Sequence, residues 1–112
     1  MSEEALKPNP EEEIARTEWN ALTAAEEDEK VPAFMGYCMA VIAARDAEAI
    51  SIQEASYKIC GATSLVPSEA LSSLEEAIDI ACDLELPQGQ RKPENRDEQI
   101  SWQKLKDLFI GA

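Results

Sequence analysis

A chain of 112 residues has the length of one domain and, by surface scaling, can bury about two-thirds of its unfolded surface without disulfide or metal support. Its 23 acidic and 10 basic residues give a formal net charge of −13, which disfavours binding to nucleic-acid phosphates and to anionic membrane surfaces. The class of partner that such a field attracts is a cationic protein surface.

The N-terminal region predicts a short lead-in followed by a helix. Residues 1–9 have the composition of a flexible segment, and we expect a single helical domain over residues 10–112. Asn9 followed by proline and three glutamates is a typical helix start. We expect this helix to run to about residue 28 and to end in the acidic run 26–29, whose charges oppose the helix dipole. Its expected inward face consists of Ala15, Trp19, Leu22 and Ala25.

The least polar part of the sequence lies near its middle. Residues 34–44 (FMGYCMAVIAA) carry no charge, so we expect the helix at about residues 32–47 to be surrounded by the others. Gly36, Ala40 and Ala44 recur every four residues, a spacing that lets a neighbouring helix approach closely. The uncharged run is too short for a membrane span, which needs about 20 residues.

A capping motif predicts the start of the third helix. Ser51 and Glu54 match the pattern S-x-x-E, and about ten helical residues follow. The apolar face of this helix includes Ile52 and Ile59. Tyr57 lies off that face, so we expect it to be exposed and to be a candidate anchor for a partner.

The fourth predicted helix, at residues 68–84, has two unlike faces. One face is apolar with a 3.6-residue period, and the other carries Glu69, Glu76, Asp79 and Asp83. No basic residue within the helix relieves the repulsion between these acids. The acidic face has three interpretations. It is a solvated surface, or one neutralised by Arg91, Lys92 and Arg96 folding back; it is a docking surface for a basic partner; or it is a divalent-cation site formed by carboxylates such as Glu76, Asp79 and Asp83.

The C-terminal part predicts a basic loop and a last helix. The connection at residues 86–96 contains Arg91, Lys92 and Arg96 among prolines and glutamines, and we expect it to be exposed. Its basic side chains can bind an anionic ligand or dock on the acidic face of another copy. The last helix, at about residues 97–110, begins with acids and carries lysines further along, as the helix dipole favours. Its expected buried side consists of Trp102, Leu105 and Phe109.

These elements together predict the fold class. Five helices with short connections, and no pattern typical of a strand, indicate an all-α protein. We expect a compact bundle of about five helices packed around the central apolar helix. The middle helices are too short, and their apolar faces too wide, for a coiled-coil seam.

The reactive residue types favour binding over catalysis. Cys38, Cys60 and Cys82 lie at apolar helix positions without a C-x-x-C motif, so we expect three free thiols and a reducing, cytoplasmic environment. The sequence has no histidine, which removes the commonest general base and metal ligand. Its four glycines form no phosphate-binding loop. We therefore expect no enzyme, no cofactor and no metal site.

The leading functional hypothesis is a non-enzymatic protein–protein interaction module that binds a protein partner through its acidic first and fourth helices, and a basic partner is the version that the charge favours. An inhibitor or immunity protein that shields a cationic site is a concrete version. A carboxylate-based metal-binding protein or small enzyme is one alternative, and a structural homodimer is another. The residues expected to contact a partner are Glu69, Glu76, Asp79, Asp83 and Tyr57.

Overall fold

The computed structural model describes residues 10–111, except the side chain of residue 11. Within this range the chain forms α-helices and short 3₁₀ helices but no strand, which confirms the predicted all-α bundle. The lead-in expected at residues 1–9 and the Asn9 cap lie outside the described residues. The α-helices are α1 (Pro10–Ala24), α2 (Lys30–Asp46), α3 (Ile52–Ala62), α4 (Glu75–Leu84) and α5 (Glu98–Ile110).

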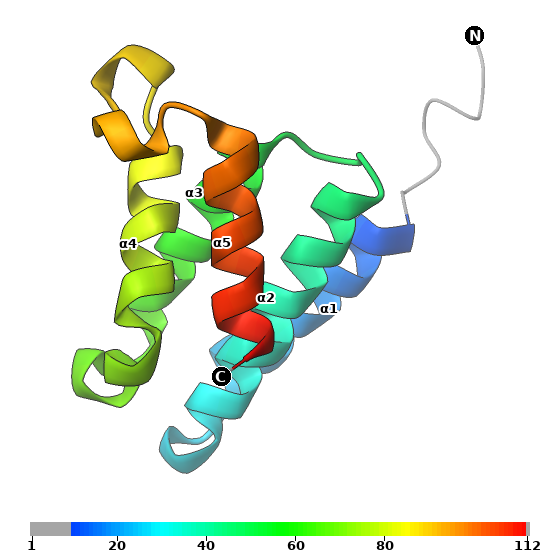
Figure 1. Cartoon of the computed structure of the whole chain (residues 1–112). Coiled ribbons are helices and arrows are strands. Elements are labelled where there is room, and N and C mark those ends of the chain that lie inside the picture. The colour runs from blue at the N-terminus through cyan, green and yellow to red at the C-terminus, as the bar shows by residue number, and fades with distance from the viewer. Residues whose placement is uncertain (1–9, 112) are drawn as a thin grey trace, which may run out of the picture.

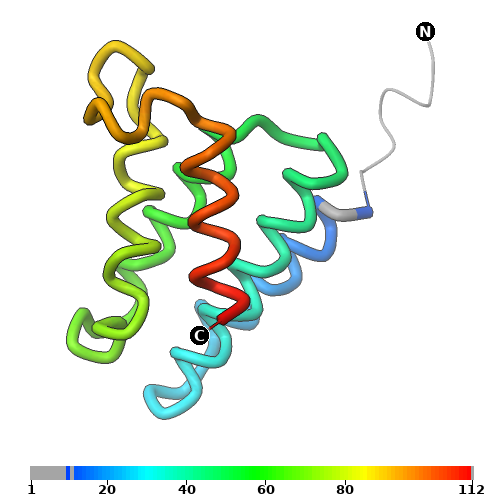
Figure 2. The backbone as a smooth tube through the Cα atoms, in the orientation of Figure 1, coloured from blue at the N-terminus to red at the C-terminus, as the bar shows by residue number. Residues whose placement is uncertain are grey.

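Consecutive helices run in alternating directions (Figure 1). α1 and α2 form a hairpin joined through the 3₁₀ helix Glu27–Glu29, and α3 packs against α2 on its other side. α4 packs between α3 and α5, and α5 returns to contact α2, as the path of the chain shows (Figure 2). No helix in the described part of the chain is long and apolar enough to cross a membrane.

The central position predicted for α2 is confirmed. Phe34, Cys38 and Val41 have no exposed surface, and Ile42 is 4 % exposed. α2 contacts α1, α3 and α5, so its uncharged sequence meets protein on several sides, which is the arrangement that an all-round apolar helix requires. The Phe34 ring packs on Phe109 of α5 with 6.4 Å between ring centroids.

Side-chain caps begin two of the helices, and the sequence predicts the one at α3. The Ser51 hydroxyl accepts a hydrogen bond from the backbone N–H of Glu54 at 3.0 Å. Asp97 accepts one from the backbone N–H of Ile100 at 3.3 Å. These bonds satisfy backbone donors that have no partner in the first helical turn, and they fix where α3 and α5 start.

The first helix ends earlier than predicted. α1 stops at Ala24, not near residue 28, and Glu26 adopts an extended conformation before the 3₁₀ helix Glu27–Glu29. The acidic run thus lies in the connection and at the N-terminal side of α2. There its charges face the positive end of a helix dipole, whereas at the end of α1 they would face the negative end.

The fourth helix differs from its prediction in geometry. Ser68–Leu74 is a 3₁₀ helix, and the α-helix begins only at Glu75. With 3.0 residues per turn, side chains three apart share a face, and seven such residues advance the helix phase by about 140° relative to an α-helix. The apolar face is nevertheless buried as predicted, and Asp83 is the residue of the predicted acidic face that is buried instead of exposed. The buried apolar positions are Leu71, Leu74, Ala77, Ile80 and Ala81.

Candidate functional site

The five residues expected at a partner-binding surface do not form one site. Glu69, Glu76 and Asp79 are exposed, but Asp83 is only 8 % exposed. Tyr57, at 64 % exposed, lies on α3 and lines a groove that none of the four carboxylates lines. The structure therefore separates the aromatic anchor from the acidic face.

The exposed carboxylates are partly neutralised by the protein itself. Glu76 forms an ion pair with Lys104 of α5 at 2.9 Å, and both side chains are about 60 % exposed. An exposed pair of this kind contributes only about 0.2–1 kcal/mol to stability. Glu69 and Asp79 have no Lys or Arg nitrogen within 4.0 Å among residues 10–111. These two carboxylates are what remains of the predicted acidic docking face.

Asp83 has a structural role, contrary to its prediction as a surface contact. Its Oδ2 atom accepts hydrogen bonds from Asn95 Nδ2 at 2.7 Å and from the backbone N–H of Lys92 at 3.0 Å. Asn95 Oδ1 accepts a further bond from Ser101 Oγ at 2.9 Å. The network ties the connection after α4 to both α4 and α5, so Asp83 is unavailable to a partner or to the predicted cation site.

Arg91 is also buried, which corrects the expectation of an exposed basic loop. Its guanidinium donates to the carbonyls of Leu86 and Leu84, each at 2.9 Å. It also pairs with the Glu98 carboxylate at 3.0 Å. The carbonyls at the end of α4 lack helical partners, and the planar guanidinium satisfies two of them at once. Of the predicted basic patch, Lys92 and Arg96 are exposed.

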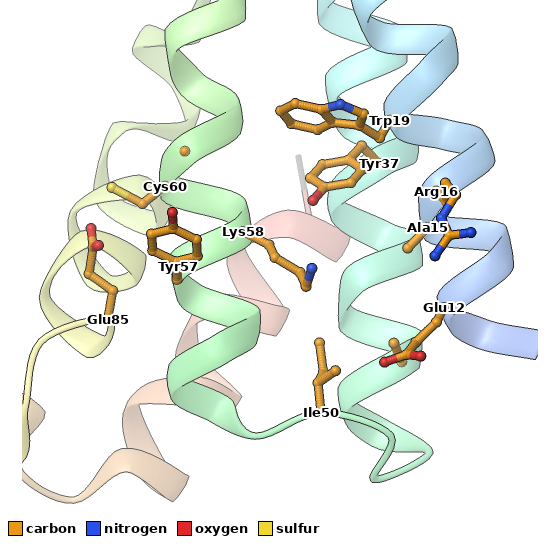
Figure 3. Close-up of a pocket in the computed structure, with 12 residues that line it drawn as sticks. Glu12, Ala15, Arg16, Trp19, Tyr37, Ile50, Tyr57, Lys58, Cys60 and Glu85 are labelled. Atoms are coloured by element: carbon orange, nitrogen blue, oxygen red, sulfur yellow. The ribbon is translucent and has the colours of Figure 1, made fainter. Parts of the chain in front are cut away.

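A groove of about 680 Å³ lies between the α1–α2 hairpin and α3 (Figure 3). This volume falls in the range of about 300–1,000 Å³ that is typical of small-ligand sites. Its wall is largely apolar and includes Trp19, Tyr37, Ala44 and Ile50. The Trp19 and Tyr37 rings meet edge to face, with centroids 5.2 Å apart and planes at 60°. Tyr57 contributes a third aromatic ring from the opposite side.

Half of the aromatic residues of the chain line this groove. The sequence contains two Trp, two Tyr and two Phe residues. Trp19, Tyr37 and Tyr57 line the groove, whereas both phenylalanines and Trp102 are buried in the core. Sequence reasoning marked Tyr57 as exposed but missed the groove, because its three aromatic rings come from three different helices.

The polar side chains of the groove carry charges of both signs. Arg16 of α1 and Lys58 of α3 line it from opposite walls, and Glu12 and Glu85 lie away from the aromatic pair (Figure 3). Neither cation has a carboxylate oxygen within 4.0 Å among the side chains that the structure describes, which are those of residues 10 and 12–111. The groove therefore holds two cations without an ion-pair partner among the described residues of a strongly acidic chain.

Burial fixes the protonation of two groups of α2. It raises the pKa of Tyr37 to about 12, so the Tyr37 hydroxyl stays protonated at neutral pH. Burial also raises the pKa of the Cys38 thiol, which keeps that sulfur neutral. Neither group is activated as a nucleophile, because a nucleophile needs a lowered pKa or a nearby base.

The expectation of three free thiols is wrong. Cys60 of α3 and Cys82 of α4 form a disulfide, and Cys38 is the free, buried cysteine. Disulfides persist mainly in oxidising compartments, so the cysteines no longer support a cytoplasmic location. Glu85 lies near the bridge, and one ligand atom each from Cys60, Cys82 and Glu85 lie within 4.8 Å of one another. Sulfurs joined to each other offer no thiolate for a metal.

These cysteine assignments predict the thiol content of the purified protein. Without reductant, we expect no rapid reaction of the native chain with a thiol-specific disulfide reagent, because Cys38 is buried and neutral. Denaturation should release one reactive thiol per chain, and denaturation after reduction should release three. Three reactive thiols in the denatured, unreduced chain would contradict the disulfide.

No protein-family model, curated protein or solved structure matches this chain. Its site is therefore identified from its own residues.

Proposed function

We propose that this chain is a non-enzymatic binding module whose recognition site is the groove between the α1–α2 hairpin and α3. The observation that carries this proposal is the gathering of three of the six aromatic side chains around one groove of about 680 Å³, with Tyr57 64 % exposed beside it. Aromatic side chains supply much of the binding energy at recognition sites, since they offer a large apolar area with few rotatable bonds.

The chemistry of the groove supports binding rather than covalent catalysis. Cys60 lines the groove but is in a disulfide, and the pKa of Tyr37 is raised rather than lowered. The sequence contains no histidine to act as a general base beside either group. What the groove offers is an apolar wall with a few polar groups, which is the composition of a binding site.

A second candidate function is docking of a basic protein partner on the acidic exterior. The net charge of −13 supports it through long-range attraction, and Glu69 and Asp79 are exposed carboxylates without a cation within 4.0 Å among the described residues. Asp83 no longer belongs to this surface. Such a complex should weaken from low to moderate salt, whereas insertion of an apolar group into the groove should not.

A photo-crosslinking amino acid placed at Tyr57 tests the proposed function. We expect adducts from the native source at this position and few at Ile100, a 67 % exposed position on α5 that serves as the matched control. Intact mass then identifies the occupant: a small ligand, a protein, or a second copy of the chain. Adducts of equal yield at both positions, or none at Tyr57, would rule out the groove as the recognition site.

A further inference from the structure

We propose that the groove binds a small amphipathic carboxylate, a molecule with an apolar body and a single anionic end. This inference rests on the proposed function and names the ligand class of the same site. Three features carry it: the apolar wall, an unpartnered hydroxyl at that wall, and two cations on opposite sides.

The apolar body would lie against the aromatic pair. Trp19 is half-buried, and its ring meets the Tyr37 ring at 5.2 Å, so the two form one continuous apolar surface. Ala44 and Ile50 extend this surface along the end of α2 and the connection to α3. An alkyl or aryl group placed there leaves water for an apolar environment, which favours binding in proportion to the apolar area that is buried.

The Tyr37 hydroxyl is the polar group that points to a ligand. The side chain is 95 % buried, being 5 % exposed, and its hydroxyl makes no hydrogen bond to any residue in the described range. In the described range, two side-chain polar atoms are fully enclosed and have no hydrogen-bond partner, namely Ser56 Oγ and Trp102 Nε1. The Tyr37 hydroxyl is not one of them, so its oxygen remains accessible from the groove. Figure 3 shows it directed into the gap between α2 and α3. A protonated hydroxyl in this position can donate a hydrogen bond to an incoming oxygen.

Arg16 and Lys58 supply the charge that selects an anion. They extend from α1 and α3 toward the same groove (Figure 3), and neither has a carboxylate within 4.0 Å among the described side chains. A carboxylate has two oxygens and accepts several hydrogen bonds. It can therefore accept from the Tyr37 hydroxyl and from a cation together, and bonds between ionised groups are about twice as strong as neutral ones.

The charge of the groove favours one negative charge over two. Glu12 and Glu85 also line it, so its two cations and two carboxylates sum to zero. A monoanion held near the cations gains their attraction with limited repulsion from the acids. A dianion such as a phosphate monoester would meet stronger repulsion from these two carboxylates and from a chain of net charge −13.

Calorimetric titration of the purified, oxidised chain with decanoate tests the proposal. Decanol and decyltrimethylammonium are probes with the same alkyl chain and a neutral or cationic end. We expect saturable binding of decanoate, at least about tenfold tighter than either analogue, because only the anion gains charge-assisted hydrogen bonds. Equal or tighter binding of decanol or of decyltrimethylammonium would overturn the proposal, as would no binding of decanoate.

Matched variants locate the binding. Lys58→Gln should weaken decanoate about tenfold, and Tyr37→Phe should weaken it several-fold while keeping the ring. Lys92→Gln makes the same charge change at an exposed position outside the groove and should leave the affinity unchanged. Circular dichroism of each variant confirms that it folds. An equal loss of affinity in Lys58→Gln and Lys92→Gln would show that the carboxylate of decanoate is not bound in the groove.

The two tests separate the ligand class from the function of the groove. Crosslinked adducts at Tyr57 together with no binding of decanoate would overturn the carboxylate but leave the groove as the recognition site. Absence of both would overturn both proposals.

Discussion

Replacement of Arg91 by methionine is expected to lower the free energy of unfolding by about 3 kcal/mol, because two carbonyl groups lose their hydrogen-bond donor. The guanidinium, 3 % exposed, donates to Leu84 and Leu86 at the end of α4 and pairs with Glu98. Methionine preserves the unbranched apolar stem of arginine, so the loss of the hydrogen bonds made by the guanidinium dominates the effect. For a domain of this size the midpoint of thermal unfolding should fall by about 13 °C.

Urea unfolding followed by circular dichroism measures this effect, with Arg96→Met as the matched control. Arg96 is exposed in the same connection, and its replacement should change the free energy of unfolding by less than about 0.5 kcal/mol. Arg91→Lys should fall between the two, because an ammonium cannot reproduce the planar fork that reaches both carbonyls. An Arg91→Met variant as stable as the wild type would show that the connection is not held by this side chain.

The sequence predicted the helices well because their signals are local. The uncharged run of α2 and the capping serine of α3 act within one or two turns, and both predictions agree with the structure. The predicted apolar face of α5 also agrees with the structure, since Trp102 and Leu105 keep a helical spacing and are buried. Such patterns require no knowledge of which helix packs against which.

The predictions that failed depend on how one element meets another. Asp83 lies within α4 on the same helical face as Glu76 and Asp79, but the connection after α4 folds over it, and its carboxylate accepts a hydrogen bond from the backbone N–H of Lys92. Its burial also needs Asn95, twelve residues later, as a partner. Arg91 had the composition of a surface loop, and only the open carbonyls of α4 explain why it turns inward.

The groove and the disulfide could not be predicted because each joins residues from different helices. Trp19, Tyr37 and Tyr57 become neighbours only when α3 packs beside the α1–α2 hairpin. Cys60 and Cys82 are 22 residues apart, and pairing them requires the antiparallel register of α3 against α4. Sequence spacing alone does not reveal which cysteines pair.

Reduction of the Cys60–Cys82 bridge is expected to lower the free energy of unfolding by about 3 kcal/mol. In the chain-entropy account, a bridge restricts the unfolded ensemble, and closing a loop of 22 residues corresponds to about 3 kcal/mol. Urea unfolding with and without a phosphine reductant measures the difference. The double variant Cys60→Ala/Cys82→Ala should match the reduced wild type closely and should not respond to the reductant.

These two measurements separate the effect of the covalent link from the effect of the packing of the two sulfur atoms. Both cysteines are half-buried, so a loss seen only in the alanine variant would come from packing, and a loss shared with the reduced wild type would come from the covalent link. Cys38 is unchanged in every sample and cannot contribute. Because Cys60 also lines the groove, loss of the bridge frees one wall from α4, and decanoate affinity should fall together with stability. Unchanged stability on reduction would show that helix packing alone holds α3 against α4.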